Sequence, residues 1–541
     1  MTSTAFNLIR EAWIPVRRAD GAREWREWIA PWQITEGLDD PNPIQALDWP
    51  RPDFNGAGLE LLIGLLAATL APKDEDGWFA VWEAPPTPEA LRTAFESVAF
   101  AFDLDGDGPR FMQEWGGLDS PSQRGMASLL IDQPGEQSVE RNADHFVKQG
   151  NINALSPALA AMALYTVQAY SPAGGRGFLT SMRGGGPLTT LAVMDPRGRP
   201  AALWHQLWPN VPLAHPADWP DWRAKPEWVF PWLVATRHAQ AYPVTTPEHG
   251  HPLQAFFGMP RRVRLVFEPS GNRVCDLGGP AGALLATGWQ TRQHGVKYEG
   301  WKHPLSPHVA KEGAMPSSVK GNPGGATYRH WLGLVVADNA KDKRLPAQAI
   351  STARRLANDT LDGLRLIAFG YDMDNAKARC WYQSEMPLPL LAPNVNREDF
   401  ENRTAQLVKA ADLAAGLTRT AIKQALFSRP GDAPGDFSHL GERFWKATEP
   451  AFFDHVGGLA KNPDDATLRQ DWAKCLQKSA LAQFDASVPM EGIEEGDMKR
   501  VVKARGSLVY KLLRDGGLEK ALGLEAPERK PKRKTKGKEA A

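Results

Sequence analysis

Residues 171–190 combine a high density of glycine with two arginines and no carboxylate. Glycine lets the backbone adopt positive φ and approach another surface closely, and bare N–H groups beside guanidinium groups suit an anion. The segment has neither the Gly-Lys-Ser/Thr ending of a Walker loop nor the spacing of a dinucleotide-binding turn. It therefore indicates either a loop that faces a polyanion or a flexible surface turn. Its glycines and charges are Gly174, Gly175, Gly177, Gly184, Gly185, Gly186, Arg176 and Arg183.

Residues 103–114 match the sequence pattern of a calcium-binding loop. Pro109 follows the central glycine, Arg110 occupies the usual aliphatic position, and two glycines interrupt the helix that should leave the loop. A polar turn is therefore the preferred interpretation, with calcium binding as the alternative. The four carboxylates at the first, third, fifth and twelfth positions are those of Asp103, Asp105, Asp107 and Glu114.

His249 and His251 could offer two imidazoles to a metal, but no further ligand lies close in the sequence. The chain contains no Cys-x-x-Cys, no nucleophile elbow and no His-Glu-x-x-His. No cofactor and no metal are expected, and nothing points to catalysis. A calcium-dependent enzyme that uses residues 103–114 with these two histidines remains the alternative function.

The apolar run of residues 364–369 leads into a polar turn and returns through Arg379, which is typical of a β-hairpin. The turn contains Asp374, Asn375 and Ala376. A short amide at a hairpin tip can enter a DNA groove and disturb base stacking. The simpler interpretation is an ordinary Asp-Asn turn.

The composition limits the possible classes of protein. Lys+Arg and Asp+Glu both number 63 in 541 residues, so any positive surface must be local. Three widely spaced cysteines suit a reducing cytosol, and the absence of a signal segment and of a long apolar run argues against a membrane. Twenty tryptophans belong in a core or at partner contacts, which leaves a protein-binding scaffold as a third hypothesis.

Residues 1–392 indicate an α+β fold, a large mixed domain with long loops. We expect strands over residues 6–16 and 188–194, and helices over residues 58–70 and 156–170.

From residue 393 to residue 524 the pattern becomes helical and predicts an antiparallel four-helix bundle. The first helix begins after Asn396, a candidate cap, and the others are expected near residues 440–460, 465–484 and 496–515. The last helix is either an ordinary solvated face or a phosphate-facing basic stripe of Lys499, Arg500, Lys503, Arg505, Lys511 and Arg514. The basic tail, residues 525–541, is expected to be disordered.

Several short motifs occur in one order along the chain: Phe6-Asn7-Leu8-Ile9, Trp13-Ile14-Pro15-Val16, Phe111-Met112-Gln113, the run from Asn142 to Lys148, Arg183-Gly184-Gly185, the run from Trp301 to Pro307, and Gly370-Tyr371-Asp372-Met373-Asp374-Asn375. In this the chain resembles the CasA family, the large subunit of the type I-E CRISPR surveillance complex Cascade. The resemblance implies a non-catalytic protein that reads a short motif beside the target in duplex DNA and starts strand separation, while the guide RNA reads the rest. The implied partners are other Cascade subunits, the guide CRISPR RNA, double-stranded target DNA and a helicase–nuclease.

The resemblance also assigns roles to individual residues. Some relatives carry extra cysteines that could bind zinc, but here only Cys275 lies in the comparable region, so no zinc is expected. Arg176 stands where the family has a glycine. The assigned DNA-motif contacts are Ala173, Gly174, Gly175, Arg176, Gly177 and Arg292; the strand wedge is Asp374, Asn375 and Ala376; and the loop near the guide end contains Asn142, His145, Phe146 and Lys148.

Overall fold

The structure is a computed structural model, and its contacts divide the chain into two compact units. Unit 1 comprises Met1–Ala326 and Gly333–Leu388, and unit 2 comprises Thr327–Leu332 and Pro389–Ala541. Across the part of the chain that is described, no helix is both long and apolar enough to cross a membrane. The described residues are 5–18, 27–133, 150–175, 177–198, 200–214, 221–321, 324–338, 343–357, 361–374, 377–432, 435–488 and 495–525.

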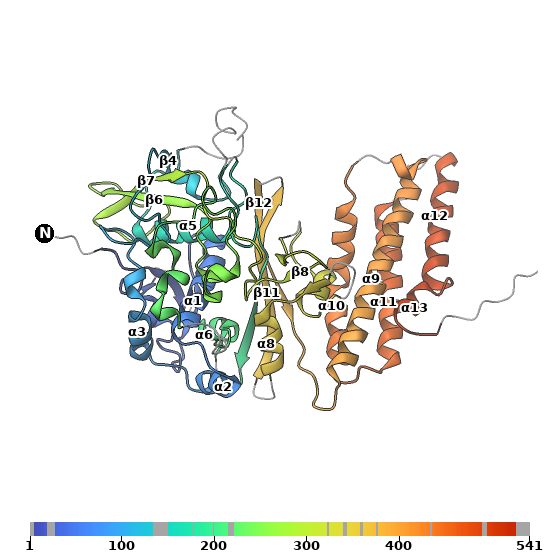
Figure 1. Ribbon diagram of the computed structural model, residues 1–541. Helices are drawn as coiled ribbons and strands as arrows, with labels where there is room; N and C mark the ends of the chain where they lie inside the picture. The colour runs from blue at the N-terminus through green and yellow to red at the C-terminus, as the bar shows by residue number, and fades with distance from the viewer. Residues whose placement is uncertain are drawn as a thin grey trace, which may run out of the picture. The chain divides into compact units, whose positions relative to one another are not determined.

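Unit 1 mixes short antiparallel sheets with helices (Figure 1). Its described helices are α1 (Pro52–Thr69), α2 (Glu75–Glu83), α3 (Pro88–Glu96), α5 (Pro157–Tyr170), α6 (Trp204–Leu207) and α8 (Gln348–Leu356), and α7 (Trp331–Leu334) lies where the chain passes from unit 2 back to unit 1. The described strands are β1 (Ile14–Arg18), β2 (Glu27–Ile29), β3 (Ile44–Leu47), β4 (Ser122–Gly125), β5 (Thr189–Pro196), β6 (Arg262–Pro269), β7 (Leu284–Arg292), β8 (His308–Ala310), β9 (Ser317–Ser318), β10 (Lys343–Leu345), β11 (Leu361–Asp374) and β12 (Lys377–Pro387). Within the described ranges they form sheets in the orders β2-β1-β3, β10-β8-β9, β12-β11-β5 and β4-β7-β6.

Helices α1 and α5 form the centre of unit 1 and pack against each other. Both begin with a proline at the first helical position, where the missing N–H costs nothing, and Ser156 caps α5. Nearly every residue of the two helices is buried, so each helix is enclosed by protein around its whole circumference. This leaves polar side chains such as Glu60 in the interior, where they require partners.

The hairpin of β11 and β12 is the longest strand pair in the described chain (Figure 1). Strand β5 pairs with β11 only as far as Phe369, which lies opposite Thr189. Beyond that point β11 and β12 continue as a two-stranded arm that ends with Asp374 opposite Lys377. Other parts of the fold must therefore support the arm, because isolated two-stranded ribbons are marginally stable.

Many tryptophans of unit 1 are in its core. Trp78 stacks on Trp82 with ring centroids 5.7 Å apart, and Trp204 stacks on Trp208 at 5.4 Å. All four side chains are buried. Their role here is core packing, which removes them from the partner contacts considered for a scaffold.

Unit 2 is helical. Helix α9 contacts each of the other three long helices, and Asn396 caps it by accepting N–H bonds from the first turn. Tyr328, from the short segment that belongs to this unit, stacks on Phe452 and hydrogen-bonds Thr448 at 2.6 Å. The described helices are α9 (Arg397–Leu426), α10 (Ser438–Leu459), α11 (Ala466–Ser487), α12 (Glu495–Leu513) and α13 (Gly517–Ala521).

The predicted fold class is confirmed: a mixed α+β body and a C-terminal helical region. The strand expected over residues 6–16 is wrong in its first part, because a strand exists only from Ile14. Asn7 redirects the chain before it, since its side chain accepts the N–H of Ile9 and donates to the carbonyl of Ala99.

Candidate nucleic-acid interface

Residues 171–187, here called the glycine loop, fold back on themselves. The N–H of Ser181 donates to the carbonyl of Ser171, and an outer turn closes through bonds between Gly174 and Phe178 and between Phe178 and Gly175. Gly175 has φ +91° and is exposed, with open space around the position of a Cβ. Gly175 therefore offers exposed backbone with no side chain to a partner.

Arg261 contacts both sides of the glycine loop, a role that the sequence did not reveal. Its guanidinium donates to the carbonyl of Pro172 at 2.5 Å and to that of Leu179 at 3.3 Å. Burial and the nearby charge of Arg124 lower the pKa of Arg261 to about 10, so it stays charged at neutral pH. It keeps positive charge directly behind the loop.

Arg292 is the last residue of β7 and leads into a turn, residues 292–296, that lies against the glycine loop. The N–H of His294 donates to the carbonyl of Gly177 at 2.7 Å. A Cβ at Gly177 would come within 2.7 Å of the Gln293 Cβ, so only glycine allows this approach. The structure thus brings together two segments that the sequence separates by more than 100 residues.

The Arg292 side chain is available to a partner. It is 42% exposed, and its ion pair with Asp119 is a long contact of 3.4 Å to a fully exposed carboxylate. Nearby on β4, Arg124 lies over the rings of Phe178 and Trp289. The exposed backbone of the glycine loop therefore lies near two cations, Arg292 and Arg124. The chain's net charge is zero, so this is a local positive region.

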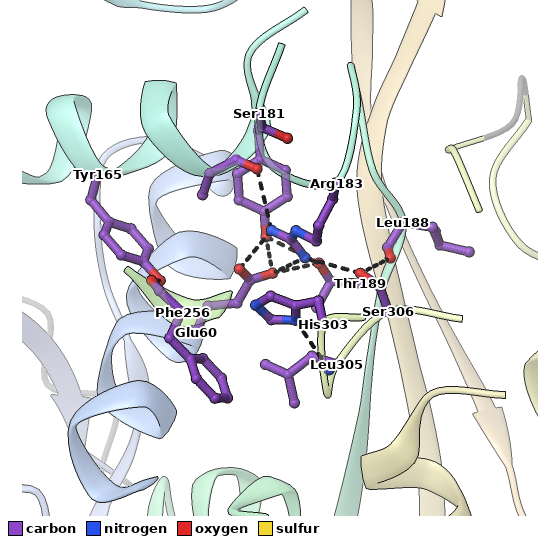
Figure 2. A network of polar contacts seen from close by, with 12 residues as sticks. Glu60, Tyr165, Ser181, Arg183, Leu188, Thr189, Phe256, His303, Leu305 and Ser306 are labelled. Atoms are coloured by element: carbon purple, nitrogen blue, oxygen red, sulfur yellow. Dashed lines mark hydrogen bonds and ion pairs between the residues drawn. The ribbon is translucent and has the colours of Figure 1, made fainter. Parts of the chain in front are cut away.

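A buried polar network contacts the glycine loop at Arg183 (Figure 2). Arg183 and Glu60 form a two-pronged ion pair with distances of 2.8 and 3.1 Å, and both side chains are almost completely buried. Thr189 and Ser306 accept further bonds from the same guanidinium, and Tyr170 donates to Glu60. Burial is the largest single influence on Arg183 and lowers its pKa, but the charge and hydrogen bonds of Glu60, together with the neighbouring tyrosines, raise it by more, so the net shift is upward. Arg183 is thus a structural residue, not a free cation facing outward.

His303 lies beside this network (Figure 2). Its Nδ1 accepts the N–H of Leu305, and its ring packs edge-on against Phe256. Burial, with a smaller contribution from the charge of Arg183, lowers the pKa of His303 well below its usual value. His303 is therefore neutral at physiological pH.

The predicted wedge lies at the end of the β11–β12 arm. Asp374 is exposed and is the last described residue of β11. Below it, buried Asp372 pairs with Arg379, and Tyr371 donates to Asp53 at 2.5 Å. The arm is therefore held by buried polar contacts just below the exposed residue Asp374.

The basic residues of α12 do not all lie on one face. At about 100° per residue, Lys499 and Lys503 share the outer face of α12, and exposed Arg514 follows its last residue, Leu513. Arg505 points to another side and pairs with Asp485 of α11 at 2.7 Å. Arg500 and Lys511 are half-buried at the flank, and Arg500 pairs with Asp497 and donates to a carbonyl of α9. If the helix presents a basic stripe, the stripe therefore consists of Lys499 and Lys503 with Arg514 just beyond the helix end.

The calcium pattern of residues 103–114 has other partners. Glu114, its twelfth position, is buried and bonds Arg262 at 2.8 Å and Thr236 at 2.6 Å. Asp103 and Asp105 accept bonds from Asn7 and from the N–H of Phe6. Among the described residues no group of three or more His, Cys, Asp or Glu side chains could hold a metal. The contacts of Asp103, Asp105 and Glu114 favour the polar-turn interpretation.

Several predicted site residues lie outside the described residues: Arg176, Asn375, Ala376, Asn142, His145, Phe146, Lys148 and residues 526–541 of the tail. Their assigned roles stay predictions.

Comparison with known proteins identifies the family. The model of the family described as CRISPR-associated protein Cse1 matches residues 7–483. This chain belongs to the Cse1 family. Among solved structures, the fold of this Cse1-family chain is similar to that of CasA from Thermus thermophilus, with a TM-score of 0.65, 18% identity and coverage of 94% of this chain and 100% of the other.

Two further structures share the fold. Cse1 from Acidimicrobium ferrooxidans gives a TM-score of 0.63 at 18% identity, with coverage of 96% and 99%. A chain of a CRISPR RNA-guided surveillance complex gives 0.66 at 18% identity, with coverage of 94% and 100%. No curated protein matches this sequence. At such low identity the structural matches establish the fold, and the Cse1 family model independently supports the resemblance drawn from the short motifs.

Proposed function

We propose that this chain is the large subunit of a guide-RNA surveillance complex of the Cascade type, and that it recognises a short motif in duplex DNA beside the target. Membership of the Cse1 family supports the assembly. One observation carries the DNA contact: the hydrogen bond from His294 to Gly177, which joins the exposed glycine turn to the turn of Arg292. Bare backbone can enter a narrow groove, and a neighbouring guanidinium can neutralise phosphate or enter the minor groove.

The β11–β12 arm is the element proposed to start strand separation. It is long, is supported at its base by β5, and exposes Asp374 at the edge of the turn that contains Asn375. A polar tip inserted beside the motif would unstack the first base pair, after which the guide RNA pairs with the target strand. In this proposal the chain is non-catalytic, and a separate helicase–nuclease cuts the DNA.

The outer face of α12 is proposed as a secondary polyanion contact. Lys499 and Lys503 share that face with Tyr510, which is 52% exposed, and exposed Arg514 follows the helix end. An aromatic ring among cations suits a displaced single strand, because bases stack on the ring while the cations meet phosphates.

The proposal is tested by binding of duplex targets to a reconstituted guide-RNA complex, with and without this chain, across a library of flanking sequences. Tight binding that depends on both the chain and the flanking sequence is expected. Binding that is indifferent to the chain would contradict the proposal. Intact DNA after incubation without the helicase–nuclease is expected for a non-catalytic subunit.

A further inference from the structure

We propose that helix α1 couples DNA-motif contact to strand separation, because it binds the glycine loop through Glu60 and the β11–β12 hairpin through Asp53. The inference rests on the proposed function and adds four positioning residues to it: Glu60, Arg183, Asp53 and Tyr371. None of them is proposed to touch DNA.

The two carboxylates occupy equivalent places on α1. They are seven residues apart, which is almost two full turns, so they lie on one side of the helix about 10 Å apart along its axis. Asp53 is 1% exposed and Glu60 is 0% exposed. Helix α1 is therefore a buried element that contacts both the glycine loop and the β11–β12 hairpin.

The contact with the glycine loop runs through Arg183. Its guanidinium bonds both oxygens of Glu60 and also donates to Thr189, the first residue of β5. Thr189 donates in turn to Glu60. Figure 2 shows Arg183 reaching down from the loop to meet Glu60 beside Thr189. A shift of the loop on DNA would therefore separate a buried guanidinium from the Glu60 carboxylate, with which it forms an ion pair, and this separation is costly away from water.

The contact with the hairpin runs through Tyr371. Its hydroxyl donates to the Asp53 carboxylate at 2.5 Å. Arg51 forms an ion pair with the same carboxylate at 3.0 Å. Tyr371 lies in the two-stranded part of the arm, beyond the end of β5, and packs against Trp381 on β12. This hydrogen bond sets the direction of the arm at the point where the sheet no longer does.

A direct contact reinforces the connection. Gly186, at the end of the glycine loop, has φ +62°, and a Cβ there would clash with Met373 and lie 3.1 Å from the carbonyl oxygen of Tyr371. The loop and the arm are therefore packed against each other as well as against α1. Because packed interiors are not continuously deformable, movement of one part must be transmitted to the other.

The test uses the reconstituted surveillance complex and duplexes with 2-aminopurine beside the motif. The measured quantity is the ratio of base opening with the motif to opening without it. Tyr371→Phe removes the hydrogen bond to Asp53. Thr189→Val removes the hydroxyl that bonds both Glu60 and Arg183, with little change in side-chain shape. Each is expected to lower the ratio by about fivefold or more, a typical coupling between sites. A duplex already unpaired beside the motif should bind each variant as it binds the wild type.

The double variant distinguishes coupling from independent roles. If the two contacts act in series through α1, Tyr371→Phe combined with Thr189→Val lowers the ratio no further than the worse single variant. Losses that multiply would overturn the coupling. Tyr328→Phe is the matched control, because it removes a buried hydroxyl bond to Thr448 in unit 2 and should leave the ratio unchanged. An equal loss in this control would also overturn the proposal, since the effect would then be general destabilisation.

The same experiment separates this inference from the proposed function. A wild-type complex that shows no motif-dependent opening would overturn the proposed function and the coupling together. Motif-dependent opening in the wild type with multiplying losses in the double variant would overturn the coupling alone.

Discussion

Asp372 and Arg379 form a two-pronged ion pair across the β11–β12 arm, with both N–O distances at 2.8 Å. Asp372 lies opposite Cys380 and Met373 opposite Ala378, so Arg379 is the extra residue of a β-bulge. A bulge redirects a side chain and bends its strand. The pair neutralises a buried carboxylate just below the exposed end of the arm and fixes the local twist.

Replacing Arg379 tests this role in strand separation. Arg379→Gln leaves Asp372 without its counter-ion, so the arm is expected to lose its fixed direction and 2-aminopurine opening beside the motif is expected to fall severalfold. Affinity for the motif itself should stay within about twofold. Arg365→Gln is the control, because it breaks ion pairs with Asp195 and Glu385 on the same sheet, far from the arm's end. Equal losses in both variants would count against a specific role of the bulge.

Arg292 is expected to supply charge to the DNA contact. Arg292→Ala should weaken duplex binding and reduce the slope of log K against log salt by about one, as expected for one lost phosphate contact. Arg273→Ala is a matched control, because Arg273 is 47% exposed and also pairs with an exposed carboxylate, that of Glu268. An unchanged salt slope and unchanged motif preference in Arg292→Ala would rule out the assignment.

Gly177 is required by geometry at the junction of the two turns that are proposed to contact DNA. Its φ of +81° and the approach of Gln293 mean that Gly177→Ala introduces both backbone strain and a clash. We expect a loss of about 1–2 kcal/mol in unfolding free energy from the backbone alone, and weaker motif-dependent binding. Denaturant titration measures the first effect and duplex titration the second. Gly108→Ala, where a Cβ would meet open space, should change neither.

His303 makes the stability of unit 1 depend on pH. Its pKa lies well below 6.5 in the folded chain because burial disfavours the imidazolium, whereas the unfolded chain takes up a proton near pH 6.5. Unfolding free energy is thus at its full value above about pH 6.5. It falls by up to about 1.4 kcal/mol per pH unit as the pH decreases towards the folded pKa. His303→Asn, which keeps an acceptor for the Leu305 N–H, should show a shallower slope between pH 6.5 and 5; an identical slope would exclude His303 as the cause.

We expect two neighbouring cations of α12, Lys503 and Arg505, to differ in their effect on the salt dependence of target binding. Lys503→Gln removes an exposed charge from the outer face and should lower the salt dependence of target binding. Arg505→Gln instead breaks the ion pair with Asp485 and should leave that dependence unchanged. If both variants behave alike, the outer face has no special role in binding the polyanion.

The sequence by itself determined the elements whose signals are local. Asn396 and the apolar spacing after it predict α9, and the apolar run of residues 364–369 followed by a polar turn predicts the hairpin. The order of short motifs also indicated the family, which the family model confirms. These features depend on neighbouring residues, so a linear reading is sufficient.

Only the tertiary structure decided which residues meet and which charges are used internally. Arg183 looked like an exposed cation in a glycine-rich loop, yet it is buried against Glu60, 123 positions away. Glu114 completes a calcium pattern, yet it neutralises Arg262. A buried charge requires an opposite charge wherever the fold supplies one, and that partner is set by long-range packing rather than by spacing along the chain.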